Sequence, residues 1–93
     1  MDDTPAAAVT VELPPALVRL FPGAEQRVAV RAATVAEMLD ALNARWPGMR
    51  DRLCDSTPRI RRNINVFVEG RRAGLDTPLT PGGEVIVRMA MMG

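Results

Sequence analysis

The residues of this chain that could carry out chemistry are few, and they do not form a set suited to autonomous catalysis. The sequence has no histidine, so the candidate nucleophiles Cys54, Ser56 and Thr57 have no imidazole base to activate them. A single cysteine without histidine also excludes a cysteine–histidine metal site and an internal disulfide. We therefore predict that the protein is not an enzyme, binds no metal or cofactor of its own, and works in a reducing cytoplasm.

The end of the sequence offers a different reactive group, the carboxylate of Gly93. Residues 84–93 read Glu-Val-Ile-Val-Arg-Met-Ala-Met-Met-Gly, and their alternation predicts a strand with Val85, Val87 and Met89 on one face. No turn signal follows this strand. Because glycine has no Cβ, its carboxylate would be accessible to another protein's active site. We expect residues 90–93 to form an exposed tail whose last residue carries the function.

Strands that could support this tail are predicted from apolar alternation. Residues 9–13, 26–31 and 64–69 alternate apolar and polar side chains, and prolines or glycines bound them. Shorter elements are expected between them: an irregular lip or a single helical turn at 17–21, and a brief edge segment at 71–75.

The main helix has the clearest local signal. Thr34 and Glu37 have the spacing of a capping box, and Pro47-Gly48 ends the helix. One apolar face follows from steps of three and four: Val35, Met38, Leu39, Leu42 and Trp46. This face is wide enough to cover a sheet. Residues 49–53 are expected to form one further turn.

The order strand, strand, helix, strand, turn region, strand favours one architecture. We predict an α+β fold, a β-grasp (ubiquitin-like) roll in which one main helix covers one face of a mixed sheet of four to five strands. The predicted boundaries are a flexible N-terminal extension at 1–8, the β-grasp domain at 9–89 and the exposed tail at 90–93. The first and last strands are expected to lie side by side at the centre, with the third strand beside the last.

Length and charge set further limits on function. The chain has 93 residues, 47% of them apolar, which is enough for one packed domain without disulfides or metal. Its net charge of +1 gives no long-range attraction to nucleic acid or membrane, and no apolar run is long enough to span a bilayer. We therefore expect neither nucleic acid nor a membrane as partner.

Three segments together resemble a known family. They are Thr34-Val-Ala-Glu-Met-Leu-Asp-Ala-Leu-Asn-Ala-Arg-Trp-Pro-Gly48, Asn65-Val-Phe-Val-Glu-Gly70 and Thr77-Pro-Leu-Thr-Pro-Gly-Gly-Glu-Val-Ile-Val87. With them, residues 9–93 resemble the MoaD/ThiS ubiquitin-like sulfur carriers. The approach to the third strand, residues 59–65, is most similar to the branch that carries sulfur for cysteine synthesis and some specialised metabolites.

The resemblance implies a reaction cycle at Gly93. A partner activating enzyme would adenylate the terminal carboxylate with ATP, and a sulfur donor protein or desulfurase would convert the adenylate to a thiocarboxylate. A sulfur-accepting biosynthetic enzyme, acting in cysteine, molybdopterin, thiazole or specialised metabolism, would then use it. Ala90, Met91 and Met92 would thread the partner's active site, and the carrier itself would bind no cofactor.

One feature departs from the family pattern. The family usually ends in Gly-Gly, whereas this sequence ends in Met92-Gly93. Either the native product is longer or processed, or the activating enzyme accepts methionine at this position. Methionine is unbranched and flexible, so it could still pass through a narrow channel.

Phe67, Ile86 and Arg88 form a candidate docking patch for a partner. The predicted register places Phe67 and Ile86 in contact on the sheet face opposite the helix, beside Ala29 and with an arginine rim. The alternative is a slipped register that buries them, or two ordinary surface side chains.

Other side chains have simpler interpretations. Cys54 fits a buried or half-buried structural thiol better than a sulfur relay, and Trp46 fits a core anchor. A group of five arginines, Arg59, Arg61, Arg62, Arg71 and Arg72, fits a solvated basic edge. The rival functions are a ubiquitin-like modifier or interaction module that forms amide conjugates through the same terminus, and a more distant RNA-binding or regulatory module that uses these arginines.

Overall fold

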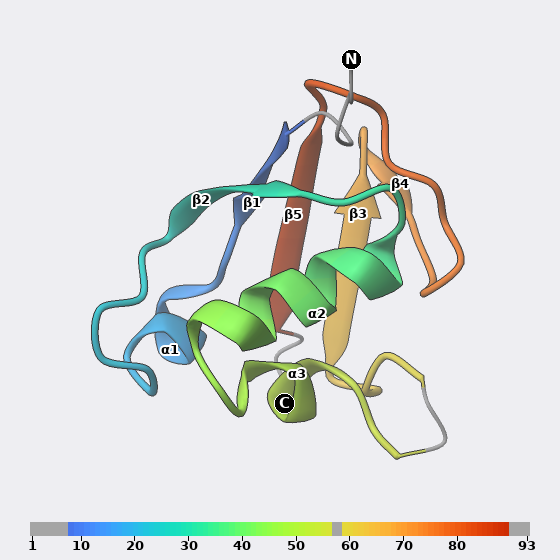
Figure 1. Cartoon of the computed structure of the whole chain (residues 1–93). Coiled ribbons are helices and arrows are strands. Elements are labelled where there is room, and N and C mark those ends of the chain that lie inside the picture. The colour runs from blue at the N-terminus through green and yellow to red at the C-terminus, as the bar shows by residue number, and fades with distance from the viewer. Residues whose placement is uncertain (1–7, 57–58, 90–93) are drawn as a thin grey trace.

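The computed structural model describes residues 8–56 and 59–89, which form one sheet with helices packed on one side of it (Figure 1). The strands are β1 (Ala8–Glu12), β2 (Arg27–Arg31), β3 (Ile64–Val68), β4 (Arg71–Arg72) and β5 (Glu84–Met89). The helices are α1 (Pro15–Val18), α2 (Val35–Arg45) and α3 (Met49–Leu53). This order of elements confirms the predicted one, and β1 begins at Ala8, one residue before the expected domain boundary.

The five strands are arranged in the order β2-β1-β5-β3-β4. β1 pairs antiparallel with β2 and parallel with β5, while β3 pairs antiparallel with both β5 and β4. The first and last strands therefore lie side by side at the centre, as predicted. A mixed sheet of this order covered by one main helix is the predicted β-grasp roll.

The helix α2 starts at the predicted capping box. Thr34 Oγ1 accepts a hydrogen bond from the backbone N–H of Glu37 at 3.2 Å. The reciprocal bond runs to the residue before the cap, since Glu37 Oε1 accepts from the backbone N–H of Ala33 at 2.9 Å. Caps of this kind contribute about 1 kcal/mol, and this one fixes where the helix begins over the sheet.

The buried face of α2 is the predicted one. Val35, Met38, Leu39 and Leu42 are fully shielded from solvent at 0% exposure. Each such side chain contributes roughly 1.5–3 kcal/mol by leaving water, so this face holds the helix onto the sheet. Trp46, expected in the core, is half-buried and packs against it from the end of the helix.

Two short helices close the end of the core at which β5 finishes. α1 buries Leu17, and α3 buries Met49 and Leu53. The chain enters α3 through Gly48 with φ 98°, and Asn43 Oδ1 accepts hydrogen bonds from the backbone N–H groups of Gly48 (3.0 Å) and Arg50 (3.1 Å). The expected helical turns at 17–21 and 49–53 are thus present, the first of them slightly earlier in the chain.

The core is entirely apolar in the part of the chain that the structure describes, where no polar or charged residue is buried. In residues 8–56 and 59–89 no helix has the length and hydropathy needed to cross a bilayer.

Candidate functional site

The last described element before the tail predicted to carry the function is β5, the central strand. Val85 and Val87 are buried at 1% and 2% exposure, and β5 is hydrogen-bonded to β1 on one side and β3 on the other. β1 pairs with residues 84–86, whereas β3 pairs along β5 to its last residue, with Ile64 opposite Met89, so the end of β5 is held by β3. Ala90, Met91, Met92 and Gly93 lie outside the described residues, so their role remains a prediction.

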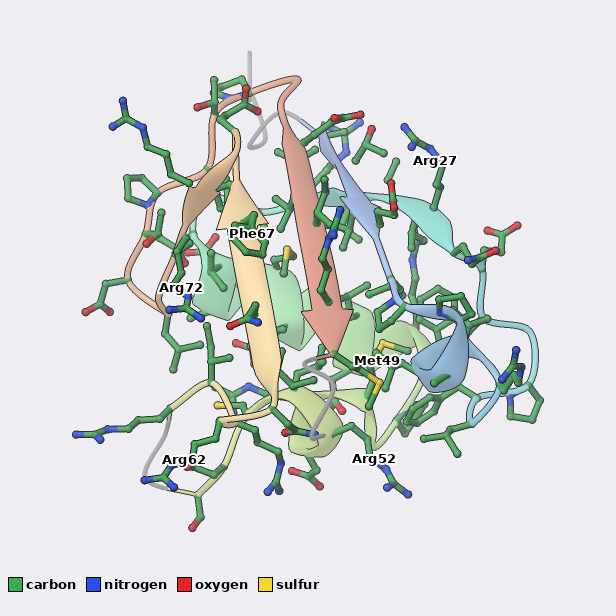
Figure 2. The ribbon with its side chains drawn as sticks, turned by 180° about the vertical axis from the view of Figure 1, so that it is seen from behind. Arg27, Met49, Arg52, Arg62, Phe67 and Arg72 are labelled. Atoms are coloured by element: carbon green, nitrogen blue, oxygen red, sulfur yellow. The ribbon has the colours of Figure 1, made fainter. Side chains whose placement is uncertain are left out.

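The predicted register of β3 and β5 is confirmed. Phe67 lies directly opposite Ile86, and both side chains are half-buried on the sheet face that α2 does not cover, here called the open face. Figure 2 shows Phe67 on this face, with Arg72 beside it at one edge of the sheet and Arg27 near the other. The slipped register that would bury the ring is excluded.

The surroundings of this pair differ from the prediction. One row crosses the open face from edge to edge and consists of Arg27, Glu12, Ile86, Phe67 and Arg72. Ile86 therefore lies beside an acidic residue of β1, not beside Ala29, which is on β2 with β1 in between. The prediction failed because it gave the face of each side chain but not its lateral neighbour.

Both acidic and basic side chains surround Phe67 and Ile86. The prediction of a rim made of arginine alone is therefore wrong. Arg27 lies 3.4 Å from Glu12 Oε1 through Nη1 and 3.3 Å from Glu84 Oε2 through Nη2. These three side chains are about half exposed, so each ion pair contributes little to stability. Arg88 pairs with Asn65 in the next row on the open face, and Arg72 donates a hydrogen bond to Asn65.

The end of the open face where β5 begins forms a shallow groove of about 400 Å³. It is lined by Phe67, Glu69, Gly70, Gly82, Gly83, Glu84 and Ile86. Glu69 has a left-handed backbone (φ 51°), and its Oε2 accepts a hydrogen bond from the backbone N–H of Glu84 at 2.7 Å. The docking patch therefore has an acidic end, which sequence reasoning missed because nothing in the local sequence marks Glu69 as a cap for β5.

A second groove, of about 500 Å³, lies at the end of β5. Leu20 and Met89, the large apolar side chains with the highest exposure among the described residues, both line it, at 50% and 39%. Arg52 and Arg61 line it as well, and Arg61 Nε donates to the carbonyl of Asp51 at 2.7 Å. Met89 shares the inward face with Val85 and Val87 as predicted, but it lies where the core ends and so remains partly exposed.

The arginine group of the sequence is divided between two elements. Arg71 and Arg72 form the edge strand β4, while Arg59, Arg61 and Arg62 lie in the segment before β3. Figure 2 shows Arg72 at the sheet edge and Arg62 in the loop below the sheet. This arrangement agrees with separate solvated basic positions.

Cys54 is buried at 3% exposure, as predicted. Its Sγ lies 3.6 Å from the carbonyl oxygen of Asp55, and its backbone forms an isolated bridge with Ile60. Within the described ranges no group of histidine, cysteine, aspartate and glutamate has the geometry of a metal site. The burial agrees with the predicted structural thiol.

Comparison with solved structures identifies close folds. The chain is 31% identical to a chain of the Amycolatopsis orientalis BexX/CysO complex, over 92% of this chain and 99% of that one, with a TM-score of 0.81. Mycobacterium tuberculosis CysO is 26% identical over 89% of this chain and 99% of its own, with a TM-score of 0.78.

The small archaeal modifier protein 1 of Haloferax volcanii is 25% identical over 92% of this chain and 100% of its own, with a TM-score of 0.78. No protein-family model matches the sequence, and no curated protein matches it significantly. The matched structures are nearly the same length as this chain, so the likeness covers a whole domain.

Proposed function

We propose that this chain, which belongs to the MoaD/ThiS family of ubiquitin-like sulfur carrier proteins, carries sulfur as a thiocarboxylate at Gly93. The observation that supports this best is the 31% identity to a chain of a CysO-containing complex, extending over 99% of that chain. In this role the protein is a substrate of partner enzymes and not a catalyst.

The chemistry requires activation by a partner because a carboxylate is a poor electrophile. A carboxylate oxygen attacks the α-phosphorus of ATP in the activating enzyme, which releases pyrophosphate and leaves an acyl adenylate. Hydrogen sulfide, or an equivalent from the sulfur donor protein, then attacks the acyl carbon and AMP departs with its oxygen. The product is the thiocarboxylate, and the proton of the sulfide passes to solvent. A closed active site protects the adenylate from water during these steps.

The described residues supply positioning for this chemistry. The first half of β5 is held between β1 and β3, and Met89 at its end is paired with Ile64 of β3, so Met89 lies at a fixed place on the domain surface. The tail Ala90, Met91 and Met92 would extend from there into the partner's active site. Phe67, Ile86 and Arg88 would contact the partner on the open face, because a half-buried aromatic–aliphatic pair loses little entropy on binding and adds apolar contact.

Intact-mass spectrometry tests the proposal. The purified chain is incubated with its activating enzyme, ATP and sulfide, and we expect a gain of about 16 Da as sulfur replaces oxygen. A chain lacking Gly93 should gain nothing. Gly74→Ala is the matched control, because a Cβ at this position meets no atom within 4 Å and the domain should be unaffected. A mass gain that persists without Gly93 would contradict the proposal.

The likeness to the small archaeal modifier protein 1 supports a second candidate, a modifier that forms an amide bond between Gly93 and a lysine of a target protein. All twelve basic residues of this chain are arginine, so its own side chains offer no lysine acceptor. Conjugates larger than the chain that survive reductant, and that are absent when Gly93 is removed, would favour the modifier. A thiocarboxylate as the sole product would favour the carrier.

A further inference from the structure

The outer edge of β2 presents unpaired backbone groups. The backbone N–H of Leu13 donates to the carbonyl of Gln26 at 2.7 Å, and the N–H of Thr10 points the other way, to Gly83 at 3.0 Å. In an antiparallel ladder the bonded residues alternate, so Val28 and Val30 bond to β1. The N–H and C=O groups of the intervening residues, Arg27, Ala29 and Arg31, therefore face away from the sheet. In residues 8–56 and 59–89 no strand pairs with this edge.

A groove of about 530 Å³ follows this edge toward α2. Its lining comes from Ala8, Ala29, Val30, Arg31, Ala41, Ala44 and Arg45. Figure 1 shows β2 running beside the C-terminal half of α2, where the last three of these residues lie. On the helix side the groove is lined by the small side chains of Ala41 and Ala44. A strand added to β2 would therefore have room for an apolar side chain between the sheet and the helix.

The groove carries positive charge that the described part of the domain does not neutralise. Arg31 and Arg45 are exposed, and neither forms an ion pair with a carboxylate in residues 8–56 and 59–89. Arg27, farther along the edge, is by contrast paired with Glu12 and Glu84. A segment with acidic residues would supply the missing counter-charges.

A second copy of this chain is a poor occupant of the edge. Antiparallel pairing of two β2 strands about Ala29 would place Arg27 of each copy opposite Arg31 of the other. Like charges directly opposite across a strand pair are destabilising. The same arginines that attract an acidic segment therefore oppose self-association.

From these observations we propose that the β2 edge binds an extended acidic segment of a partner protein as an additional strand. Its backbone would pair with Arg27, Ala29 and Arg31, an apolar side chain would enter the groove over Ala41 and Ala44, and its carboxylates would meet Arg31 and Arg45. This site is separate from the tail chemistry, since it lies at the opposite edge of the sheet from β4, with β1 between it and β5.

Amide hydrogen exchange with a defined peptide tests the site. The probe is a short capped peptide with valine, isoleucine and valine at its centre and glutamates on both sides. We expect the N–H groups of Ala29 and Arg31 to gain protection, while those of Val28 and Val30, already bonded to β1, change little. Binding should weaken as salt rises. The same peptide with N-methyl groups on its pairing edge should not bind; equal binding of both peptides would overturn the proposal.

Charge reversal within the groove provides the matched test. Arg31→Glu combined with Arg45→Glu should lower the affinity for the acidic peptide by about tenfold or more, because attraction becomes repulsion. Arg62→Glu makes the same kind of change outside the groove and should leave the affinity near that of the wild type. Thermal unfolding of each variant verifies folding. If the groove variant and the control variant both fold and lose peptide affinity equally, the assignment is contradicted. It is also contradicted if protection of the β2 edge rises with protein concentration alone, because that result indicates a second copy as the occupant.

Discussion

β5 and β2 have nearly the same sequence pattern but opposite positions in the sheet. Each places two valines in the core, Val85 and Val87 at 1% and 2% exposure and Val28 and Val30 at 4% each. β5 has a hydrogen-bonded neighbour on both sides, whereas β2 has only β1 among the described strands. Burial therefore does not distinguish the two strands, but pairing does. A doubly paired strand suits a fixed support for a reactive tail, and a singly paired strand leaves backbone groups available for recognition.

Proline substitution should separate the two strands most strongly. Ile86→Pro removes an N–H from a strand bonded on both sides, so we expect a loss of several kcal/mol or of cooperative folding. Ala29→Pro removes an N–H that faces outward from an edge strand, where proline is tolerated, and should cost far less. Urea unfolding followed by circular dichroism measures both. Similar losses for the two variants would mean that the β2 edge is paired in solution.

Gly83→Ala should show how the start of β5 is fixed. A Cβ on Gly83 would clash with Glu69 Oε2 and would lie 2.9 Å from the backbone carbonyl oxygen of Thr80. We expect the free energy of unfolding to fall by about 1–3 kcal/mol, the usual cost of overpacking.

The double variant Gly83→Ala with Glu69→Ala separates the two contacts. It removes the side-chain clash and leaves the clash with the Thr80 carbonyl, so a full return to the stability of Glu69→Ala alone would show that only the carboxylate matters. Chemical unfolding of the single and double variants gives the comparison.

Phe67→Ala should affect partner binding more than folding. The ring is half-buried on the open face opposite Ile86, so its removal should weaken docking of the activating enzyme by about tenfold. The loss of stability should stay below the cost of truncating a core phenylalanine to alanine, which is about 3–5 kcal/mol. Titration calorimetry and thermal unfolding measure the two effects. Gly74→Ala, whose added Cβ meets no atom within 4 Å, is the control and should bind normally.

Arg27→Ala should have the smallest effect. Arg27 links the edge strand to the central one through its contacts with Glu12 and Glu84, but all three side chains are exposed. We expect a change of about 0–1 kcal/mol in the free energy of unfolding, reduced further at high salt. A larger loss in urea unfolding would mean that these side-chain charges, and not only the backbone pairing of β2 with β1, hold the edge strand in the sheet.

Local patterns predicted most of the fold. The capping box at Thr34 and Glu37 located the start of α2, and the three- and four-residue steps gave its buried face. Alternation gave the inward valines of β2 and β5 and placed Phe67 and Ile86 on the open face. Each of these properties depends on residues that are close together in the sequence, within about one or two helical turns or a few strand positions. The sequence pattern therefore predicts them directly.

The sequence by itself determined which residues face the core and the order of the elements. Through a family resemblance it also marked Gly93 as the candidate functional residue. Only the tertiary structure decided lateral relations: that Glu12 and not Ala29 lies beside Ile86, and that Glu69 caps β5. It also decided that Leu20, Met89 and Arg52 line one groove, and that the outer edge of β2 has no partner among the described strands. The physical reason is that strand neighbours come from distant parts of the chain. Their pairing depends on the packing of the whole sheet and not on the period of any one strand.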